Sequence, residues 1–244
     1  AWLKRRHPGR VALLQADIRD REAVTEATAR ARAVFHFAAQ VAVTTSLADP
    51  GEDFSVNAAG TFGLLEALRR HARATPLIFA STNKVYGDLG DLATEIRDEA
   101  RRPVDASVAE RGIGEDRPLD FHTPYGCSKG AAEQYVLDYA RSFGIPTAVM
   151  RMSCIYGPRQ MGTEEQGWVA HFLICMLDGR PITIFGDGRQ VRDVLYVDDA
   201  VEAYWRAWRR IDRVAGTAFN LGGGPANAVS LVQLNRAAET ILGV

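Results

Sequence analysis

The feature that most constrains the fold of this chain is a regular alternation of short apolar segments with longer helical ones. Four runs of almost continuous apolar residues are predicted to be strands: 11–16, 33–39, 76–81 and 146–152. Helices are predicted between them, at about 20–32, 52–71 and 123–144, the last one ending at Gly144. Apolar strands separated by helices are typical of a parallel sheet that helices cover on both faces. The sequence therefore predicts an α/β fold with a doubly wound parallel sheet over residues 1–152.

After Met152 the alternation becomes irregular. A loop is expected at 153–167, and the segments that follow are predicted as a helix at 168–178, strands at 181–185 and 194–197, a helix at 198–210, a strand at 217–223 and a helix at 230–243. We interpret 153–244 as a smaller, mixed domain interleaved with the end of the sheet, to which 194–210 returns. The polar stretch 88–122 is predicted to be a surface loop.

A glycine-rich loop is missing from the first part of the chain. Dinucleotide-binding α/β proteins open with a strand and a loop of the G-x-G-x-x-G type, whose backbone holds a pyrophosphate. The only early glycine here is Gly9. The expectation is that the sequence begins after the first βα unit of such a fold.

Composition excludes several classes of partner. The formal net charge is −1, so nothing suggests binding to nucleic acid or to an anionic membrane surface. No apolar run approaches the ~20 residues of a membrane span. Cys127, Cys154 and Cys175 lack the close spacing of metal ligands, so no metal is expected, and unpaired cysteines fit a reducing cytoplasm.

Tyr125 and Lys129 form the most suggestive pair in the chain. They are four residues apart on a predicted helix and therefore share one face. An ammonium beside a phenol favours the phenolate, so the pair predicts a Tyr125 pKa below its usual value of ~10 and a usable general acid/base. Taken alone, the spacing fits an ordinary surface tyrosine and lysine equally well.

The context of the pair favours chemistry. Ser81 and Thr82 follow the strand at 76–81, and ligands of open α/β sheets bind at the carboxyl ends of strands. Ala38 and Ala39 end the preceding strand with small side chains, and Asn57 lies in a helix expected beside the site. Each could be a simple packing or surface residue, but their joint occurrence in this order indicates a site.

Together these segments resemble the extended short-chain dehydrogenase/reductases, the family of the nucleotide-sugar epimerases and dehydratases. The motifs are AD-I (16–18), FHFAAQ (35–40), NAAGT (57–61), STNKVYG (81–87), PYGCSK (124–129), RMSCIYGPRQ (151–160) and FGDGRQVRDVLYVDD (185–199). The resemblance implies a Rossmann-like fold with NAD as cofactor in its first domain, a nucleotide-sugar substrate and a homo-oligomer.

The resemblance also assigns residues. It gives the catalytic triad as Thr82, Tyr125 and Lys129. It gives the cofactor site as Asp17, Ile18, Ala38, Ala39, Gln40, Asn57, Ser81, Tyr125, Lys129 and Met152, with Asp17 and Ile18 at the adenine. It gives the substrate site as Thr82, Asn83, Cys154, Gln166, His171, Phe185 and Arg192, with Arg192 on the diphosphate; a surface salt bridge with Asp193 is the alternative for Arg192.

Two further stretches bear on the reaction. In the 4,6-dehydratases of this family an Asp-Glu pair follows the catalytic threonine, whereas Asn83 and Lys84 stand here, which disfavours dehydration. RQMGTEEQGWVAHF (159–172) resembles the CDP-paratose/CDP-tyvelose 2-epimerases. That resemblance implies inversion at C2 of a CDP-linked dideoxyhexose through a keto-sugar, with no net redox change. A UDP-sugar 4-epimerase and a non-catalytic nucleotide-binding protein remain as alternatives.

Overall fold

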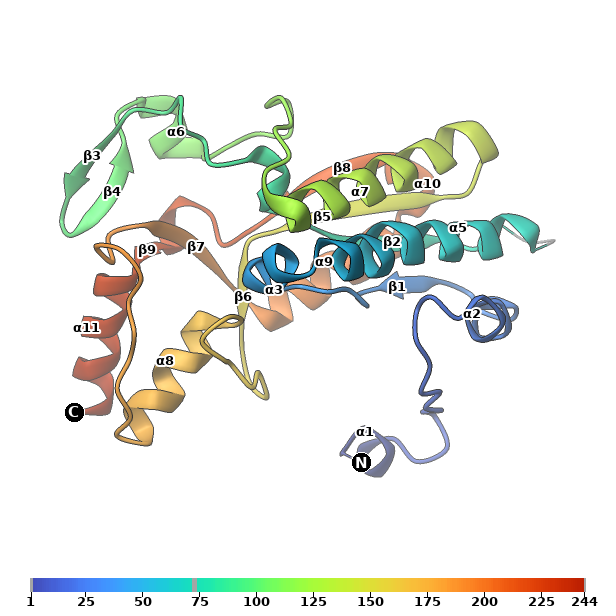
Figure 1. Ribbon diagram of the computed structural model, residues 1–244, viewed down its shortest axis with the longest axis horizontal. Coiled ribbons are helices and arrows are strands. Elements are labelled where there is room, and N and C mark those ends of the chain that lie inside the picture. Colours follow the sequence, from blue (N-terminus) through green and yellow to red (C-terminus); the bar gives the residue numbers. More distant parts are fainter. Residues whose placement is uncertain (1, 72–73, 244) are drawn as a thin grey trace.

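The computed structural model describes residues 2–71 and 74–243, and its centre is a four-stranded parallel sheet (Figure 1). The strand order is β1-β2-β5-β8. These strands are β1 (Val34–His36), β2 (Leu77–Thr82), β5 (Thr147–Met152) and β8 (Thr217–Leu221). Every residue of β2 is buried, as expected for a central strand of a parallel sheet. The predicted α/β class and the Rossmann-like arrangement are confirmed.

Helices cover both faces of this sheet (Figure 1). On one face, Leu65, Phe79, Val136 and Val149 belong to a core shared by the helices α2 (Arg21–Thr28), α5 (Gly60–Arg70) and α7 (Thr123–Phe143). On the other face, Tyr204 and Ala207 of α9 (Val197–Arg209) pack on alternate residues of β2 and β5, and α10 (Ile211–Val214) extends this layer.

The long helix α7 has clear start and stop signals. Pro124 lies in its first turn, where a missing backbone N–H costs nothing. Gly144 ends the helix with φ +67°, a left-handed conformation that favours glycine. Gly130 lets the helix approach Phe121 closely, because a Cβ at this position would lie 2.4 Å from a carbon of the Phe121 ring. The start of α7 is thereby fixed against the loop that precedes it.

A second group of elements lies beside the main sheet, at the left of Figure 1. It contains a three-stranded sheet in which β7 is parallel to β6 and antiparallel to β9, and a separate β3–β4 hairpin. Its strands are β3 (Thr94–Arg97), β4 (Ala100–Pro103), β6 (Cys154–Tyr156), β7 (Val191–Tyr196) and β9 (Ala228–Ser230). Its helices are α6 (Ala106–Arg111), α8 (Trp168–Leu177) and α11 (Leu231–Leu242), and α8 packs against α11.

The remaining helices are short. They are α1 (Trp2–Arg6), α3 (Val43–Ala48), α4 (Pro50–Phe54), the π-helical η1 (Ser55–Ala59) and the 3-10 helices η2 (Asn83–Tyr86) and η3 (Pro225–Asn227). The helix predicted at 52–71 is therefore one helical stretch, α4–η1–α5, with a π segment around Asn57.

Several predicted elements were wrong. Residues 11–16 form no strand: among the described residues no strand pairs with this segment, and Leu13 and Leu14 are exposed and pack in no core. Residues 181–185 are also irregular. Most residues of the stretch 88–122 are exposed, as predicted for a surface segment. The stretch is nevertheless not a plain loop: β3 and β4 pair as an antiparallel hairpin, and α6 follows them.

The prediction that 194–210 returns to the sheet was half right. The helix α9 packs on the main sheet. The strand that precedes it, β7, instead pairs with β6 and β9, because β8 occupies the place beside β5.

In the described residues, no helix is both long enough and apolar enough to span a membrane.

Candidate active site

The carboxyl end of β2 and the first two turns of α7 bring three predicted residues together. Thr82 is the last residue of β2, and Tyr125 and Lys129 lie one turn apart on α7. The Thr82 hydroxyl lies close enough to the Tyr125 phenol to lower its pKa, and it accepts a hydrogen bond from the backbone N–H of Lys84 at 3.2 Å. The backbone N–H of Tyr125 donates to Ser46 Oγ at 3.2 Å, which fixes the first turn of α7 on α3.

The expected lowering of the Tyr125 pKa is not found. Burial raises the pKa of the Tyr125 phenol; the Thr82 hydroxyl lowers it only in part, and the Asp53 carboxylate raises it further. Burial also lowers the pKa of Lys129 to about 7, although the Glu133 and Asp53 carboxylates each raise it in part. The prediction counted the attraction between ammonium and phenolate but not the cost of burying both groups. In this structure Tyr125 is therefore a protonated phenol at neutral pH.

Lys129 is buried in an unusual environment. Only 3% of it is exposed, and its Nζ lies 4.1 Å from the centre of the Phe79 ring, a cation–π contact. In the part of the chain that the structure describes, it forms no ion pair. A buried ammonium without a bonded carboxylate is costly, so its hydrogen-bonding capacity is open to a bound molecule.

Asn57 anchors the loop that follows β1. Its Oδ1 accepts from the Gln40 backbone N–H at 2.9 Å, and its Nδ2 donates to the Gln40 carbonyl at 3.0 Å and to Ser128 Oγ at 3.1 Å. Asn57 therefore links the loop containing Ala38, Ala39 and Gln40 to α7, and a solvated surface role is excluded by its burial.

Ile18 and Asp17 lie at the outer side of the same face. Ile18 borders a hollow of about 230 Å³, together with Ala59 and Gly63. Gly60 allows this packing, since a Cβ there would lie 2.9 Å from Ile18 Cγ2. Both carboxylate oxygens of Asp17 accept hydrogen bonds from Arg19, at 2.7 and 2.9 Å.

A buried polar network beneath the site was missed by the sequence analysis. The Ser81 hydroxyl, predicted to face the cofactor, donates instead to Glu133 Oε2 at 2.6 Å. Arg151 donates to Glu133 Oε1 at 2.6 Å and to the Tyr86 hydroxyl at 2.6 Å. The available signal was a glutamate one turn after Lys129 on the same helix face. Of the two hydroxyls at the end of β2, Thr82 is thus the one beside Tyr125.

Arg192 and Cys154 lie at the substrate side of the predicted site. Cys154 accepts a hydrogen bond from Trp168 Nε1 at 3.3 Å, and burial raises the pKa of its thiol. The nearby Arg192 guanidinium acts in the opposite direction on this thiol. The alternative assignment of Arg192 to a salt bridge with Asp193 is not supported, because its guanidinium donates to the Val191 carbonyl at 2.8 Å. Asn83, between Thr82 and Lys84, is half-buried.

Four other predicted residues have different surroundings. Phe185 is 67% exposed, and Met152 packs in the α9 layer, where its sulfur accepts a hydrogen bond from Tyr204. Gln166 donates to the Val41 carbonyl, which connects the 153–167 loop to the loop after β1. His171 lies against Cys175 on the next turn of α8. No contact of the described residues joins these four to Tyr125.

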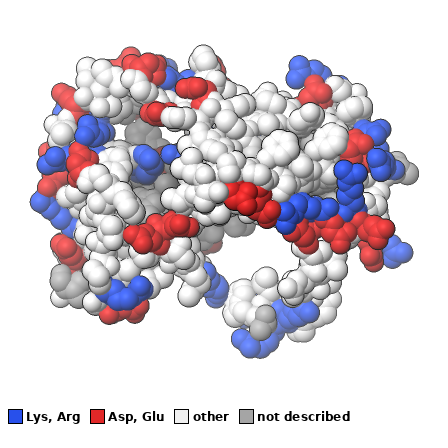
Figure 2. Space-filling model, viewed as in Figure 1, with Lys and Arg blue, Asp and Glu red and all other residues white. Residues whose placement is uncertain are grey.

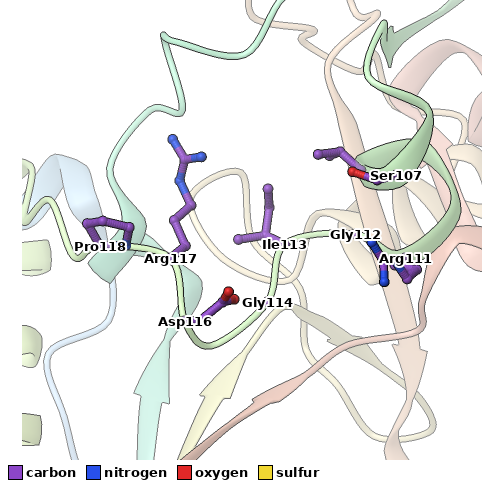
Figure 3. A pocket seen from close by; sticks show the side chains of 9 residues that line it. Ser107, Arg111, Gly112, Ile113, Gly114, Asp116, Arg117 and Pro118 are labelled. Atoms are coloured by element: carbon purple, nitrogen blue, oxygen red, sulfur yellow. The ribbon is translucent and has the colours of Figure 1, made fainter.

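The shape of the molecule is consistent with a site between its two parts. Figure 2 shows the surface hollowed between the main sheet and the elements around β7, with a basic side chain inside the hollow. A separate hollow of about 520 Å³ lies along the loop that follows α6, where Arg111, Ile113 and Arg117 face it (Figure 3). None of the predicted site residues lines this second hollow.

Comparison with known proteins places the chain among enzymes of nucleotide sugars. Residues 2–222 match the model of the NAD dependent epimerase/dehydratase family. The CDP-paratose 2-epimerase of Salmonella typhi is 42% identical over 95% of this chain and 70% of its own length. A dTDP-glucose 4,6-dehydratase of Mycolicibacterium smegmatis is 35% identical over 81% of this chain. That match covers 53% of the dehydratase, about half of its length.

The fold comparison agrees. The UDP-glucose 4-epimerase of Thermus thermophilus, solved in complex with NAD, has a TM-score of 0.79 and 31% identity. The match covers 98% of this chain and 72% of that structure.

Proposed function

The chain belongs to the NAD dependent epimerase/dehydratase family, and from this premise we propose that it is an NAD-dependent epimerase that inverts C2 of a CDP-linked dideoxyhexose. The observation that carries the choice of reaction is the 42% identity with a CDP-paratose 2-epimerase over 95% of the chain. The preference for CDP-sugars, a homo-oligomeric state and a cytoplasmic location belong to the same proposal. So does the division into a cofactor part, 1–152, and a substrate part, 153–244.

The described residues fit NAD as the cofactor. Gly60 leaves Ile18 room beside a hollow of about 230 Å³, a suitable place for a flat adenine ring. The small side chains of Ala38 and Ala39 follow β1, and the Lys129 ammonium lies buried with free hydrogen-bonding capacity suited to ribose hydroxyls. When bound, NAD supplies a reversible acceptor for the hydrogen on C2 of the sugar.

The residues of the chain then have distinct tasks. Tyr125 is placed to hold and move the proton of the sugar hydroxyl as that carbon changes between alcohol and ketone. Thr82, whose hydroxyl lies beside the same phenol, can orient the sugar oxygen. Lys129, with a pKa of about 7, can stabilise the phenolate when its ammonium is charged.

Asn83 and Lys84 support epimerisation over dehydration. Elimination of water needs an acid and a base near the sugar, and an amide supplies neither at neutral pH. Lys84 follows Asn83 in η2, and burial together with the Arg192 charge lowers its pKa. Neither residue is a carboxylic acid, so these two positions do not supply the acid–base pair that elimination uses.

The deciding experiment uses a CDP-sugar deuterated at C2. We expect the protein, carrying a first βα unit with a glycine-rich loop and supplied with NAD, to equilibrate this sugar with its C2 epimer without a net change in NADH absorbance. The deuterium should be retained, because the C2 hydrogen leaves and returns within one site. Washout of the label into water would exclude the ketone route.

A UDP-sugar 4-epimerase is the second candidate, supported by the TM-score of 0.79 with the Thermus thermophilus enzyme. The same assay distinguishes the two. Inversion at C4 of a UDP-sugar, with CDP-sugars unchanged, would favour this alternative and leave the family intact.

A further inference from the structure

The register of the sheet brings Lys84 close to Arg192. Thr82 of β2 is paired with Met152 of β5, so Lys84 and Cys154, each two residues further along, leave the sheet side by side. Cys154 in turn is paired with Val194 of β7, two residues from Arg192. The charges of Lys84 and Arg192 both act on the Cys154 thiol, and the Arg192 charge acts on Lys84, so these two positive side chains from segments far apart in sequence lie near one another beside Cys154.

Among the described residues, no carboxylate forms an ion pair with Lys84 or Arg192, although Asp88 acts on Lys84 from a distance. Asp193 is held by Ser153 and also accepts from the Gly224 backbone N–H. Asp88, the other acid near Lys84, is bonded to His122 Nδ1 at 2.7 Å. The Arg192 charge and burial both lower the pKa of Lys84, as expected for two like charges that share a partly buried space. Such an arrangement is unfavourable unless an anion lies between the cations.

We propose that Lys84 is a substrate-binding residue that, together with Arg192, binds the diphosphate of the nucleotide sugar. This inference rests on the proposed function and adds to it a residue that the sequence analysis had considered only as a replacement for a dehydratase acid. The backbone N–H of Lys84 bonds to Thr82 Oγ1, so Lys84 links the catalytic hydroxyl to the diphosphate end of the substrate.

The chemistry of the two side chains suits this ligand. A guanidinium binds two phosphate oxygens in a planar fork, whereas an ammonium is a compact charge with three donors. Together they match a group that carries its negative charges on two adjacent phosphates. A ligand with a single phosphate would engage only one of the two cations, and an uncharged nucleoside would engage neither.

The test measures binding of CDP, CMP and cytidine by calorimetry, using the full chain with NAD present. Lys84→Met should weaken CDP binding by about 10- to 100-fold, as expected for loss of a charged hydrogen bond, and should leave cytidine unchanged. Arg192→Met should weaken CDP binding to a similar degree. In the double variant the fold-loss of CDP affinity should be smaller than the product of the two single fold-losses, because both side chains hold one group. UDP should respond as CDP does.

Lys4→Met is the matched control, because Lys4 is exposed on α1, and it should bind CDP as the wild type does. Lys84→Gln, which removes the charge but keeps a polar side chain, replaces Lys84→Met if that variant fails to fold by circular dichroism. Equal loss of CDP and cytidine would show a structural effect and overturn the inference.

The two proposals fail differently. Unchanged CDP affinity in Lys84→Met or Lys84→Gln overturns the role of Lys84 and leaves the proposed function standing. If the wild-type chain binds neither CDP nor UDP, the proposed function and this inference both fall.

Discussion

Tyr125 is the residue on which the proposed chemistry depends most directly. Its phenol meets the Thr82 hydroxyl at the end of the central strand β2, and its pKa is raised because it is buried. In the proposed reaction this phenol carries the proton of the sugar hydroxyl, whereas its ring makes most of its packing contacts.

Replacing Tyr125 with phenylalanine should therefore separate activity from stability. We expect turnover to fall by about 10²- to 10⁴-fold, the contribution typical of general acid/base catalysis. Thermal unfolding should change little, since only one hydroxyl is removed. A variant that keeps more than about a tenth of the wild-type rate would contradict this assignment.

Lys129 should influence the dependence of stability on pH. Its ammonium loses its proton near pH 7 in the folded protein, against an ordinary pKa of 10.5. Between these values the unfolded chain binds more protons than the folded one, so this group makes the free energy of unfolding rise with pH from about 7 to about 10.5.

Lys129→Met should remove that rise. Urea denaturation at intervals from pH 6 to 10 should show the variant gaining stability relative to the wild type at the acidic end, where the wild type must bury a charge. Lys4→Met should follow the wild-type curve throughout. Parallel curves for Lys129→Met and wild type would mean that Lys129 titrates normally.

Among the elements, α7 matters most for the site, because it carries Tyr125 and Lys129 and packs on β2. Its position depends on close packing of Gly130 against Phe121. The neighbouring helix α5 also contains a glycine, Gly63, but a Cβ there would meet no atom within 4 Å.

These two glycines make a matched pair. Gly130→Ala should destabilise the protein by about 1–3 kcal/mol, because the new methyl group overlaps the Phe121 ring. Gly63→Ala should be neutral or stabilise it by up to about 1 kcal/mol through helix propensity. Thermal and urea unfolding of both variants would test this; equal effects would show that the loop at Phe121 moves freely away from α7.

On the scale of the whole molecule, a buried ion pair connects the layers of the fold. Glu133 of α7 is fully buried and bonds to Ser81 of β2 and Arg151 of β5. Arg151 also donates a hydrogen bond to the Tyr86 hydroxyl, which in turn donates to Asn220 of β8 at 2.8 Å. Three strands and a helix are thus connected directly below the candidate site.

Removing both members of this pair should cost less than the two single changes added together. Glu133→Gln leaves a buried guanidinium without its partner, and Arg151→Met leaves a buried carboxylate, each at a cost of about 3–5 kcal/mol. The double variant should cost clearly less than the sum of the two. Free energies of unfolding for the four proteins test this, and additive effects would show that the ion pair contributes no coupling.

The sequence by itself determined the class of fold and the location of the candidate catalytic residues on its elements. Apolar strands between helices favoured a parallel sheet covered by helices. Local periodicity sets strand ends and helix faces, so it also gave the positions of Thr82, Tyr125 and Lys129 on these elements. Long elements such as α7 and β5 were predicted nearly to the residue, since their end signals lie within the sequence.

Only the tertiary structure decided what depends on neighbours distant in sequence. Residues 11–16 have the composition of a strand, but a strand forms only beside a partner, and none is present for them among the described residues. Burial, which no local pattern measures, raised the pKa of Tyr125 where charge attraction alone predicted a decrease. The engagement of Ser81 by Glu133 and the approach of Lys84 to Arg192 likewise follow from strand register and packing, which bring together side chains that the sequence leaves far apart.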